Sequence, residues 1–102
     1  MFTNLKDWCN VKVNHFRFVK RDGAGDKVLE QPKELYVYPV SEVALVKNKH
    51  GVEVVSSSHL YVDGFVALDE LDEISFEGTQ REVMAIHTFY RDGKPDIKVV
   101  YI

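Results

Sequence analysis

The segment DEISFEGTQREVMAI, residues 72–86, predicts a β-hairpin and decides how the rest of the sequence is interpreted. Ile74 and Phe76 alternate with polar neighbours, which is the pattern of a strand with one buried face. Gly78 interrupts this pattern, and a second apolar run follows from Val83 to Ile86. We therefore expect two strands, over residues 73–77 and 80–90, joined by a tight turn.

Strand and turn signals continue on both sides of this hairpin. Asp63-Gly64 and Asp92-Gly93 mark turns, and so does KNKHG at residues 47–51. Pro39 has no backbone donor for a ladder, so it marks an edge, a bulge or a bend. We expect further strands over residues 11–20, 35–38, 42–47, 52–56, 60–62 and 97–102.

Three segments allow more than one structure. Residues 1–9 hold at most one short helical turn. Over residues 11–20 the apolar face changes near Asn14-His15, so either a bulge resets the phase or both faces of the strand are covered. Residues 65–71, FVALDEL, fit either a short helix or an extended crossing.

These elements predict an all-β fold. Six to seven short antiparallel strands, with turn signals about every ten residues, are typical of small sandwiches and barrels. Because closure of a sheet removes exposed edges, we expect a small closed or partly open β-barrel, or a compact sandwich. The chain of 102 residues has the size of one domain, spanning residues 1–102, with at most one short helix.

The longest irregular segment is expected over residues 20–34. It contains two glycines, a proline and charges of both signs. Short domains rarely keep a loop of this length without a use. The segment is either a solvated connector with a hairpin-like tip at Asp22-Gly23 or a long mobile functional loop. The candidate residues of that loop are Lys20, Arg21, Asp22, Gly23, Ala24, Gly25, Asp26 and Lys27.

Charge and cysteine content restrict the function classes. A formal net charge of −3 and a pI of about 5.8 disfavour a protein whose binding depends on phosphate contacts. Cys9 has no partner for an intramolecular disulfide, which fits a reducing cytosol. No signal-peptide run opens the sequence, and no segment approaches membrane-spanning length. We therefore expect a protein that is soluble when made and has no membrane partner.

No catalytic or metal-binding constellation emerges from the sequence. The four histidines lack the spacing of a zinc pair and are expected as unrelated surface or rim residues: His15, His50, His59 and His87. Ser56–Ser58 precede His59, but neighbours on a strand point to opposite faces. These serines are therefore expected to satisfy backbone donors at a strand end. The chain is predicted to be no enzyme and to hold no metal or cofactor.

Two further patterns are explained without a ligand. Alternating aromatic residues occur in single-strand-binding proteins, but the acidic total here favours a core role for Phe16, Phe18, Tyr36 and Tyr38. Paired carboxylates can divide acid and base roles only in a buried cleft. Since the flanking sequence predicts no such cleft, a solvated acidic surface is expected for Asp69, Glu70, Asp72 and Glu73.

Two segments together resemble a known family. SSSHLYVDG (residues 56–64) and LDEISFEGTQREVMAIHTFYRDGKPDIKVVYI (residues 71–102) are similar to the head-completion proteins of long-tailed bacteriophages. These minor capsid proteins belong to the head-tail connector and include the head-closure, or stopper, proteins. The first half of the chain agrees only in outline. The resemblance rests on Asp72-Glu73, Ile74, Phe76, Gly78, residues 83–90, Asp92-Gly93 and residues 97–102.

The resemblance implies an assembly role in the virion. Such proteins are made in the host cytoplasm and form a ring, of about twelve copies, below the portal and its adaptor. The ring closes the DNA channel after packaging and offers a docking surface to the tail proteins. In this family a long loop lines or blocks the channel, touching DNA without sequence specificity. Residues 20–34 are the matching loop, and the acidic surface from Asp69 to Glu73 would face a neighbouring subunit.

Other functions stay open at this point. A tail terminator or tail-completion protein of the same particle would share a small β-rich fold. A nucleic-acid or peptide-binding barrel is a second class, and salt-dependent binding of single-stranded DNA would favour it. A small enzyme is disfavoured because no catalytic constellation is present.

Overall fold

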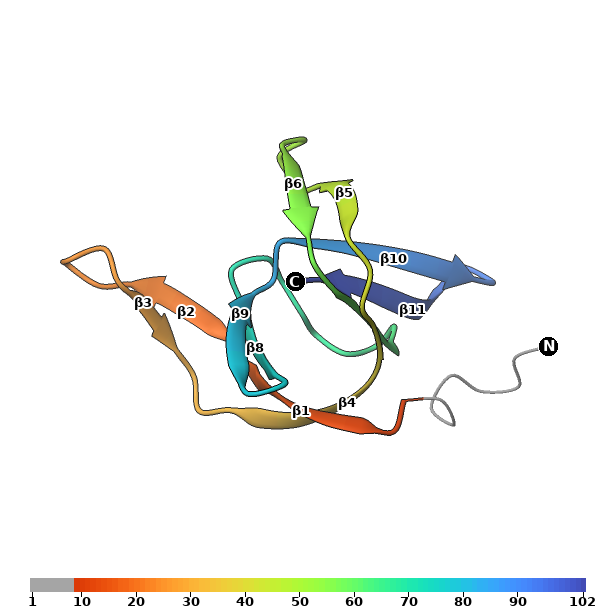
Figure 1. The fold of residues 1–102 in the computed structure, drawn as a ribbon, viewed down its shortest axis with the longest axis horizontal. Coiled ribbons are helices and arrows are strands. Elements are labelled where there is room, and N and C mark those ends of the chain that lie inside the picture. Colours follow the sequence, from red (N-terminus) through yellow and green to blue (C-terminus); the bar gives the residue numbers. More distant parts are fainter. Residues whose placement is uncertain (1–8) are drawn as a thin grey trace.

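A computed structural model describes residues 9–102, and every regular element in this range is a β-strand (Figure 1). The expected all-β class is confirmed. The short helical turn expected over residues 1–9 falls almost entirely outside the described residues. The strands are β1 (Val11–Phe16), β2 (Phe18–Arg21), β3 (Lys27–Leu29), β4 (Lys33–Val40), β5 (Ala44–Lys47), β6 (Glu53–Ser56), β7 (His59–Asp63), β8 (Glu73–Phe76), β9 (Thr79–Glu82), β10 (Ala85–Arg91) and β11 (Lys94–Tyr101).

Seven of these strands form one curled antiparallel sheet. Its order is β10-β11-β7-β4-β1-β8-β9. The sheet bends into a partly open barrel, from which two separate hairpins, β2–β3 and β5–β6, project (Figure 1). The expected six to seven strands match the main sheet, and the two hairpins raise the total to eleven.

The two edges of the main sheet meet where β9 passes into β10. The Val83 amide donates to the Asp72 carbonyl at 2.8 Å, and the Met84 amide donates to the Tyr101 carbonyl at 2.8 Å. Val83 itself is almost fully buried. The single strand expected over residues 80–90 is therefore wrong, because the chain must bend here to pass from one sheet edge to the other.

The core lies inside the curl of the main sheet. Ile74 and Phe76, the alternating residues of the predicted hairpin, both point into it and are buried. Burying a side chain of this size contributes roughly 1.5–3 kcal/mol, so the inner face stabilises the curl. The core consists of Val13, Leu35, Val37, Leu60, Val62, Ile74, Phe76, Val83, Val100 and Ile102.

The expected strand over residues 11–20 is divided at Arg17. β1 stays in the main sheet and directs Val13 inward, whereas β2 leaves the sheet to pair with β3. Val13 and His15 share one inward face, so no change of face occurs at Asn14-His15; the interruption lies at Arg17, where the chain leaves the barrel.

The irregular loop expected over residues 20–34 is instead largely a hairpin. β2 and β3 pair on either side of a turn, and the Asp22 Oδ1 atom accepts hydrogen bonds from the Ala24 and Asp26 amides, each at 2.9 Å. Gly25 adopts a φ of 88° there, which favours glycine. The hairpin-like tip at Asp22-Gly23 is confirmed, and the long unstructured loop is wrong.

The remaining strand predictions are confirmed with longer or shifted bounds. β4 continues through Pro39, which lies beyond the residues of β4 that pair with β1. β5 and β6 form the expected hairpin across residues 47–51. Residues 65–71 cross without regular structure and with a turn at each end, so the helical alternative is wrong.

The serine run before β7 holds the end of the sheet. The Ser56 hydroxyl lies 2.7 Å from the Ser58 carbonyl and 2.9 Å from the Ile102 carbonyl. The Ser57 amide donates to the Ile102 carbonyl, and the Ile102 amide donates to the Ser58 carbonyl. The serines have the expected structural role at a strand end, but the Ser56 hydroxyl donates to carbonyls, so the expectation that it satisfies backbone donors is wrong.

Gly64 is expected to tolerate no side chain. A Cβ atom at this position would lie 2.7 Å from backbone atoms of Pro95 and Asp96. Gly64→Ala should lower the free energy of unfolding by about 1–3 kcal/mol, measured by urea denaturation. Gly23→Ala is the matched control, since nothing lies within 4 Å of its Cβ position. Equal midpoints for the two variants would contradict this packing.

Candidate functional site

Asp72 lies at the centre of a buried polar junction. Its side chain is 3% exposed, and its carboxylate contacts three other parts of the chain. The His15 Nε2 atom lies 2.8 Å from Oδ2, the Phe18 amide donates to Oδ1 at 2.9 Å, and the Asp69 amide donates to Oδ2 at 3.1 Å. The expectation of a solvated carboxylate is therefore wrong for Asp72.

The junction determines where the β2–β3 hairpin begins. His15 is on β1, and the Phe18 amide is the first donor of β2, so one carboxylate binds the chain on both sides of the break at Arg17. Burying a carboxylate costs several kcal/mol unless its oxygens are well hydrogen-bonded. Three partners meet that requirement, and they hold residues 69–72 against β1.

Two of the four histidines are buried, contrary to expectation. His15 belongs to this junction, and His59 packs between the Tyr61 and Tyr101 rings, with centroid distances of 5.5 and 5.4 Å. His50 and His87 are exposed as expected.

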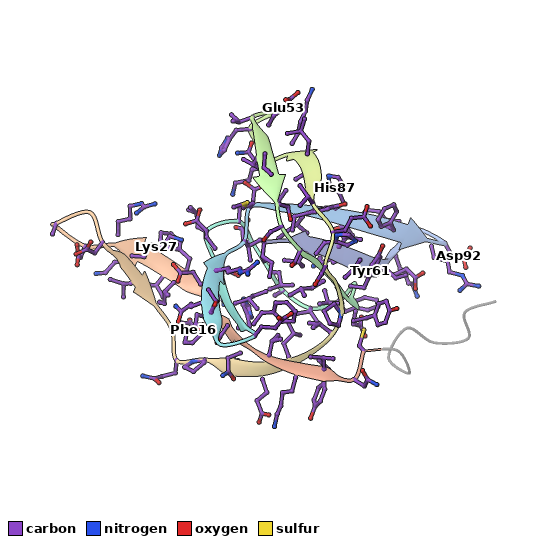
Figure 2. The ribbon with its side chains drawn as sticks, viewed as in Figure 1. Phe16, Lys27, Glu53, Tyr61, His87 and Asp92 are labelled. Atoms are coloured by element: carbon purple, nitrogen blue, oxygen red, sulfur yellow. The ribbon has the colours of Figure 1, made fainter. Side chains whose placement is uncertain are left out.

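Lys27 connects the β2–β3 hairpin to the acidic segment. Its side chain is only 12% exposed, and Nζ donates to the Leu71 carbonyl at 2.9 Å and to the Glu73 carboxylate at 3.2 Å. Nζ also contacts the Glu82 carboxylate of β9. Figure 2 labels Lys27 on the hairpin, and its partners lie 44 to 55 residues further along the sequence. The structure thus joins one predicted loop residue to one predicted acidic residue.

Leu71 is held in an unusual backbone conformation at this contact. Its φ of 82° lies in the left-handed region, which a leucine rarely adopts. The Lys27 ammonium on its carbonyl stabilises this geometry, which directs Asp72 inward and Glu73 toward the hairpin.

The other acidic pair contacts the second hairpin. The Lys49 amide donates to the Glu70 carboxylate at 2.7 Å, and Lys49 Nζ lies 3.3 Å from Asp69 Oδ1. The Lys49 and Asp69 side chains are largely exposed, so this ion pair contributes little stability. Residues 69–73 therefore contact both projecting hairpins, through a buried junction on one side and an exposed one on the other.

The remaining predicted loop residues lie away from this junction. Arg21 donates to the Gly25 carbonyl at 3.1 Å, and Asp22 organises the turn. The exposed members of the segment are Lys20, Arg21, Asp22, Gly23, Ala24, Gly25 and Asp26.

Sequence reasoning missed a surface rich in tyrosine. Tyr36 and Tyr38 alternate with the buried Leu35 and Val37, so they lie on the outer face of β4, where they are 56% and 39% exposed. The core role expected for these two tyrosines is therefore wrong. Strand pairing aligns Tyr38 with Tyr61. We call this outer side of the sheet the tyrosine face; Figure 2 labels Tyr61 and His87 of it. Its members are Tyr36, Tyr38, the buried His59, Tyr61, His87, Phe89 and Tyr101.

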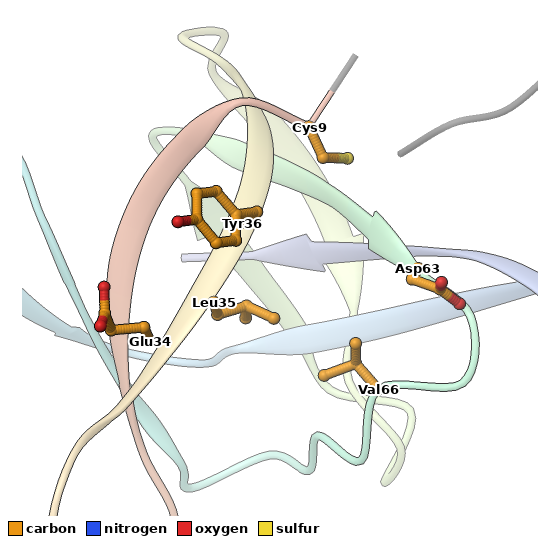
Figure 3. A pocket seen from close by; sticks show the side chains of 6 residues that line it. All are labelled: Cys9, Glu34, Leu35, Tyr36, Asp63 and Val66. Carbon is orange, nitrogen blue, oxygen red and sulfur yellow. The ribbon is translucent and has the colours of Figure 1, made fainter. Parts of the chain in front are cut away.

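A pocket opens beside Tyr36 at one end of the tyrosine face (Figure 3). It forms because β4 and β7 pair only over Tyr38–Val40 and then diverge. Its volume is about 390 Å³, and its lining is largely apolar with two carboxylates: Cys9, Glu34, Leu35, Tyr36, Asp63 and Val66. Burial raises the pKa of the Cys9 thiol, which lies 3.3 Å from the Tyr61 carbonyl.

Residues 9–102 contain no group of three or more His, Cys, Asp or Glu side chains placed to hold a metal ion. In the same range, no helix is long and apolar enough to cross a membrane.

No protein-family model matches the chain, and no curated protein matches it significantly. The resemblance to head-completion proteins therefore stays a prediction from the residues quoted above.

Removal of the Asp72 carboxylate should destabilise the whole domain. Asp72→Ala leaves His15 and two amides without their buried partner, so we expect the free energy of unfolding to fall by about 3–5 kcal/mol. Chemical denaturation measures this loss. Asp26→Ala, at an exposed position of the hairpin tip, is the control and should change little. A loss for Asp72→Ala below 1 kcal/mol would show that the junction is dispensable.

Removal of the Lys27 ammonium should loosen one hairpin without unfolding the barrel. Lys27→Met keeps most of the buried stem but loses all three contacts of Nζ. We expect amide hydrogen exchange in β2 and β3 to accelerate about tenfold, equivalent to roughly 1.4 kcal/mol of local stability. The exposed Lys20→Met is the control. Unchanged exchange in the Lys27 variant would mean that the hairpin is held by other contacts.

Proposed function

We propose that this chain is a structural virion protein of a phage head-tail connector. In this role it forms a ring below the portal and its adaptor, closes the DNA channel after packaging and presents a docking surface to the tail. The sequence resemblance in residues 56–64 and 71–102 suggests this role.

The observation that carries the proposal is the anchoring of both hairpins to one segment of the barrel. Residues 69–73 bind β2–β3 through Asp72 and Glu73, and they bind the turn after β5 through Asp69 and Glu70. A ring subunit needs a rigid body from which contact elements project in defined directions. Such an arrangement supports assembly because each projecting element loses less conformational entropy when it meets a neighbour.

The β2–β3 hairpin is the element that would face the channel. Its exposed part carries Lys20 and Arg21 on one strand and Asp22 and Asp26 in the turn. These charges cancel, so the tip neither binds the phosphate backbone tightly nor adds net repulsion to it. That balance suits a gate that must touch DNA without sequence preference and let it pass during ejection.

Deletion of the gene in a phage that carries it tests the proposal. Electron microscopy of the lysate should show free tails beside heads that packaged DNA and then lost it. Heads that keep their DNA but lack tails would instead support a tail terminator or tail-completion role. Infectious particles of normal appearance would refute any role in the virion.

A hairpin variant tests the gating part separately. Replacement of residues 22–26 by a two-residue Asn-Gly turn should preserve β2 and β3 while shortening their tip. Complementation of the deletion with this variant should give joined particles that lose DNA. Ala24→Ser, at an exposed position of the same tip, keeps its length and its charges and is the control, which should retain DNA. DNA retention equal to that of the unaltered chain would remove the gating role.

A further inference from the structure

The outer edge of β10 has no strand beside it among the residues that the structure describes. β10 lies at one end of the main sheet and pairs there with β11. The β10–β11 hairpin extends to the right in Figure 1, and β2–β3 lies on the opposite side. An unpaired edge presents a row of backbone amides and carbonyls, which an extended strand is suited to satisfy.

The pairing with β11 determines which residues of β10 direct their backbone groups outward. Tyr90 lies opposite Pro95, which has no amide to donate, and it precedes the residue pair that closes the turn at 92–93. That closing pair bonds across the ladder, so the Tyr90 amide and carbonyl point away from β11. The irregular step in this ladder adds a residue to β11 and none to β10. The alternation along β10 therefore directs the backbone groups of Thr88 and Ile86 outward as well.

β10 lacks the features that usually protect an edge strand. Residues 83–90 contain no proline and no Asp, Glu, Lys or Arg. The opposite edge of the sheet, β9, has only four residues, and its charged side chains are engaged. Arg81 donates to the Ser57 hydroxyl, and Glu82 contacts Lys27. Of the two edges of the main sheet, β10 is therefore the one open to a further strand.

A second β10 strand fits this edge without opposing like charges. In an antiparallel register centred on Thr88, the outward groups of Ile86 and Tyr90 meet those of Tyr90 and Ile86 in the other copy. The side chains of Phe89 and His87 are then opposed across the contact. Phe89 and Tyr90 are 56% and 67% exposed, so the pairing covers apolar area that a single copy leaves in solvent. An uncharged strand with this symmetric arrangement is complementary to itself.

We propose that two copies of this chain associate edge to edge through β10. The two strands pair antiparallel about a two-fold axis at Thr88, and the two main sheets become continuous across the contact. Such a contact is isologous and closes on itself, so it gives a dimer and no larger assembly. The inference goes beyond the proposed connector function and does not depend on it. The pairing belongs to the free protein, where it covers an edge that is otherwise open to strands of other chains.

The size of the contact determines the concentration at which the dimer forms. A single pair of seven-residue strands covers less than the roughly 800 Å² per partner of a stable interface. We therefore expect a dissociation constant of about 0.1 mM. The free chain should be a monomer at micromolar concentration and mostly a dimer at about 1 mM.

Amide hydrogen exchange of the unaltered chain tests the pairing residue by residue. NMR spectra at about 0.05 mM and about 1 mM protein compare the outward amides of Ile86, Thr88 and Tyr90. We expect these amides to exchange about threefold more slowly at the higher concentration, because most molecules are then paired. Gln80 follows the pair that closes the β8–β9 turn, so its amide points outward on β9 and should not change. Equal rates for the β10 amides at both concentrations would overturn the proposal.

Two matched proline substitutions each remove one outward amide from an edge of the sheet. Thr88→Pro removes a donor at the centre of the contact, whereas Gln80→Pro removes the equivalent donor from β9. Sedimentation equilibrium at about 1 mM should show mostly dimer for the unaltered chain, for Gln80→Pro and for Thr88→Val, which keeps the amide. Thr88→Pro should be a monomer whose core amides stay protected from exchange. A dimer of Thr88→Pro, or a folded Gln80→Pro that stays monomeric, would overturn the assignment of the contact to β10.

Discussion

The structure depends on the buried carboxylate of Asp72. Its oxygens bind a histidine of β1, the first amide of β2 and the amide of Asp69. A buried charge requires such partners, so none of these three segments can move without leaving the carboxylate unsatisfied. This requirement fixes the point at Arg17 where the chain leaves the barrel. It also holds residues 69–73 against β1. The positions of both hairpins follow from that arrangement.

The barrel and its hairpins differ in what they expose. The curled sheet buries its apolar residues and supplies a rigid body, while the hairpins carry exposed groups outward. Lys27 binds the first hairpin through a largely buried ammonium, and Lys49 binds the second through exposed contacts that contribute little. The second hairpin is therefore held less firmly than the first.

The sequence predicted what depends on local pattern. Alternation at Ile74 and Phe76, the turns at glycine and the serine run before His59 are short-range features, and each matches the structure. The junction could not be predicted in this way, because His15 and Asp72 are 57 residues apart and meet only through the sheet order. Asp72 stands among other acidic residues, so its sequence context does not indicate that its side chain points inward. That direction follows from the left-handed backbone at Leu71. Tyr36 and Tyr38 alternate with buried residues in a strand that is apolar on both faces, so the sequence alone did not tell core from surface.

The most direct test of the connector function is to locate the chain in purified phage particles. Particles carrying the natural chain are labelled with a gold-conjugated antibody against it and imaged by electron microscopy, and tailless heads and free tails are labelled in parallel. We expect label at the junction of head and tail, on heads that have completed packaging. Particles free of label, in a preparation where the antibody recognises the purified protein, would contradict a role in the virion.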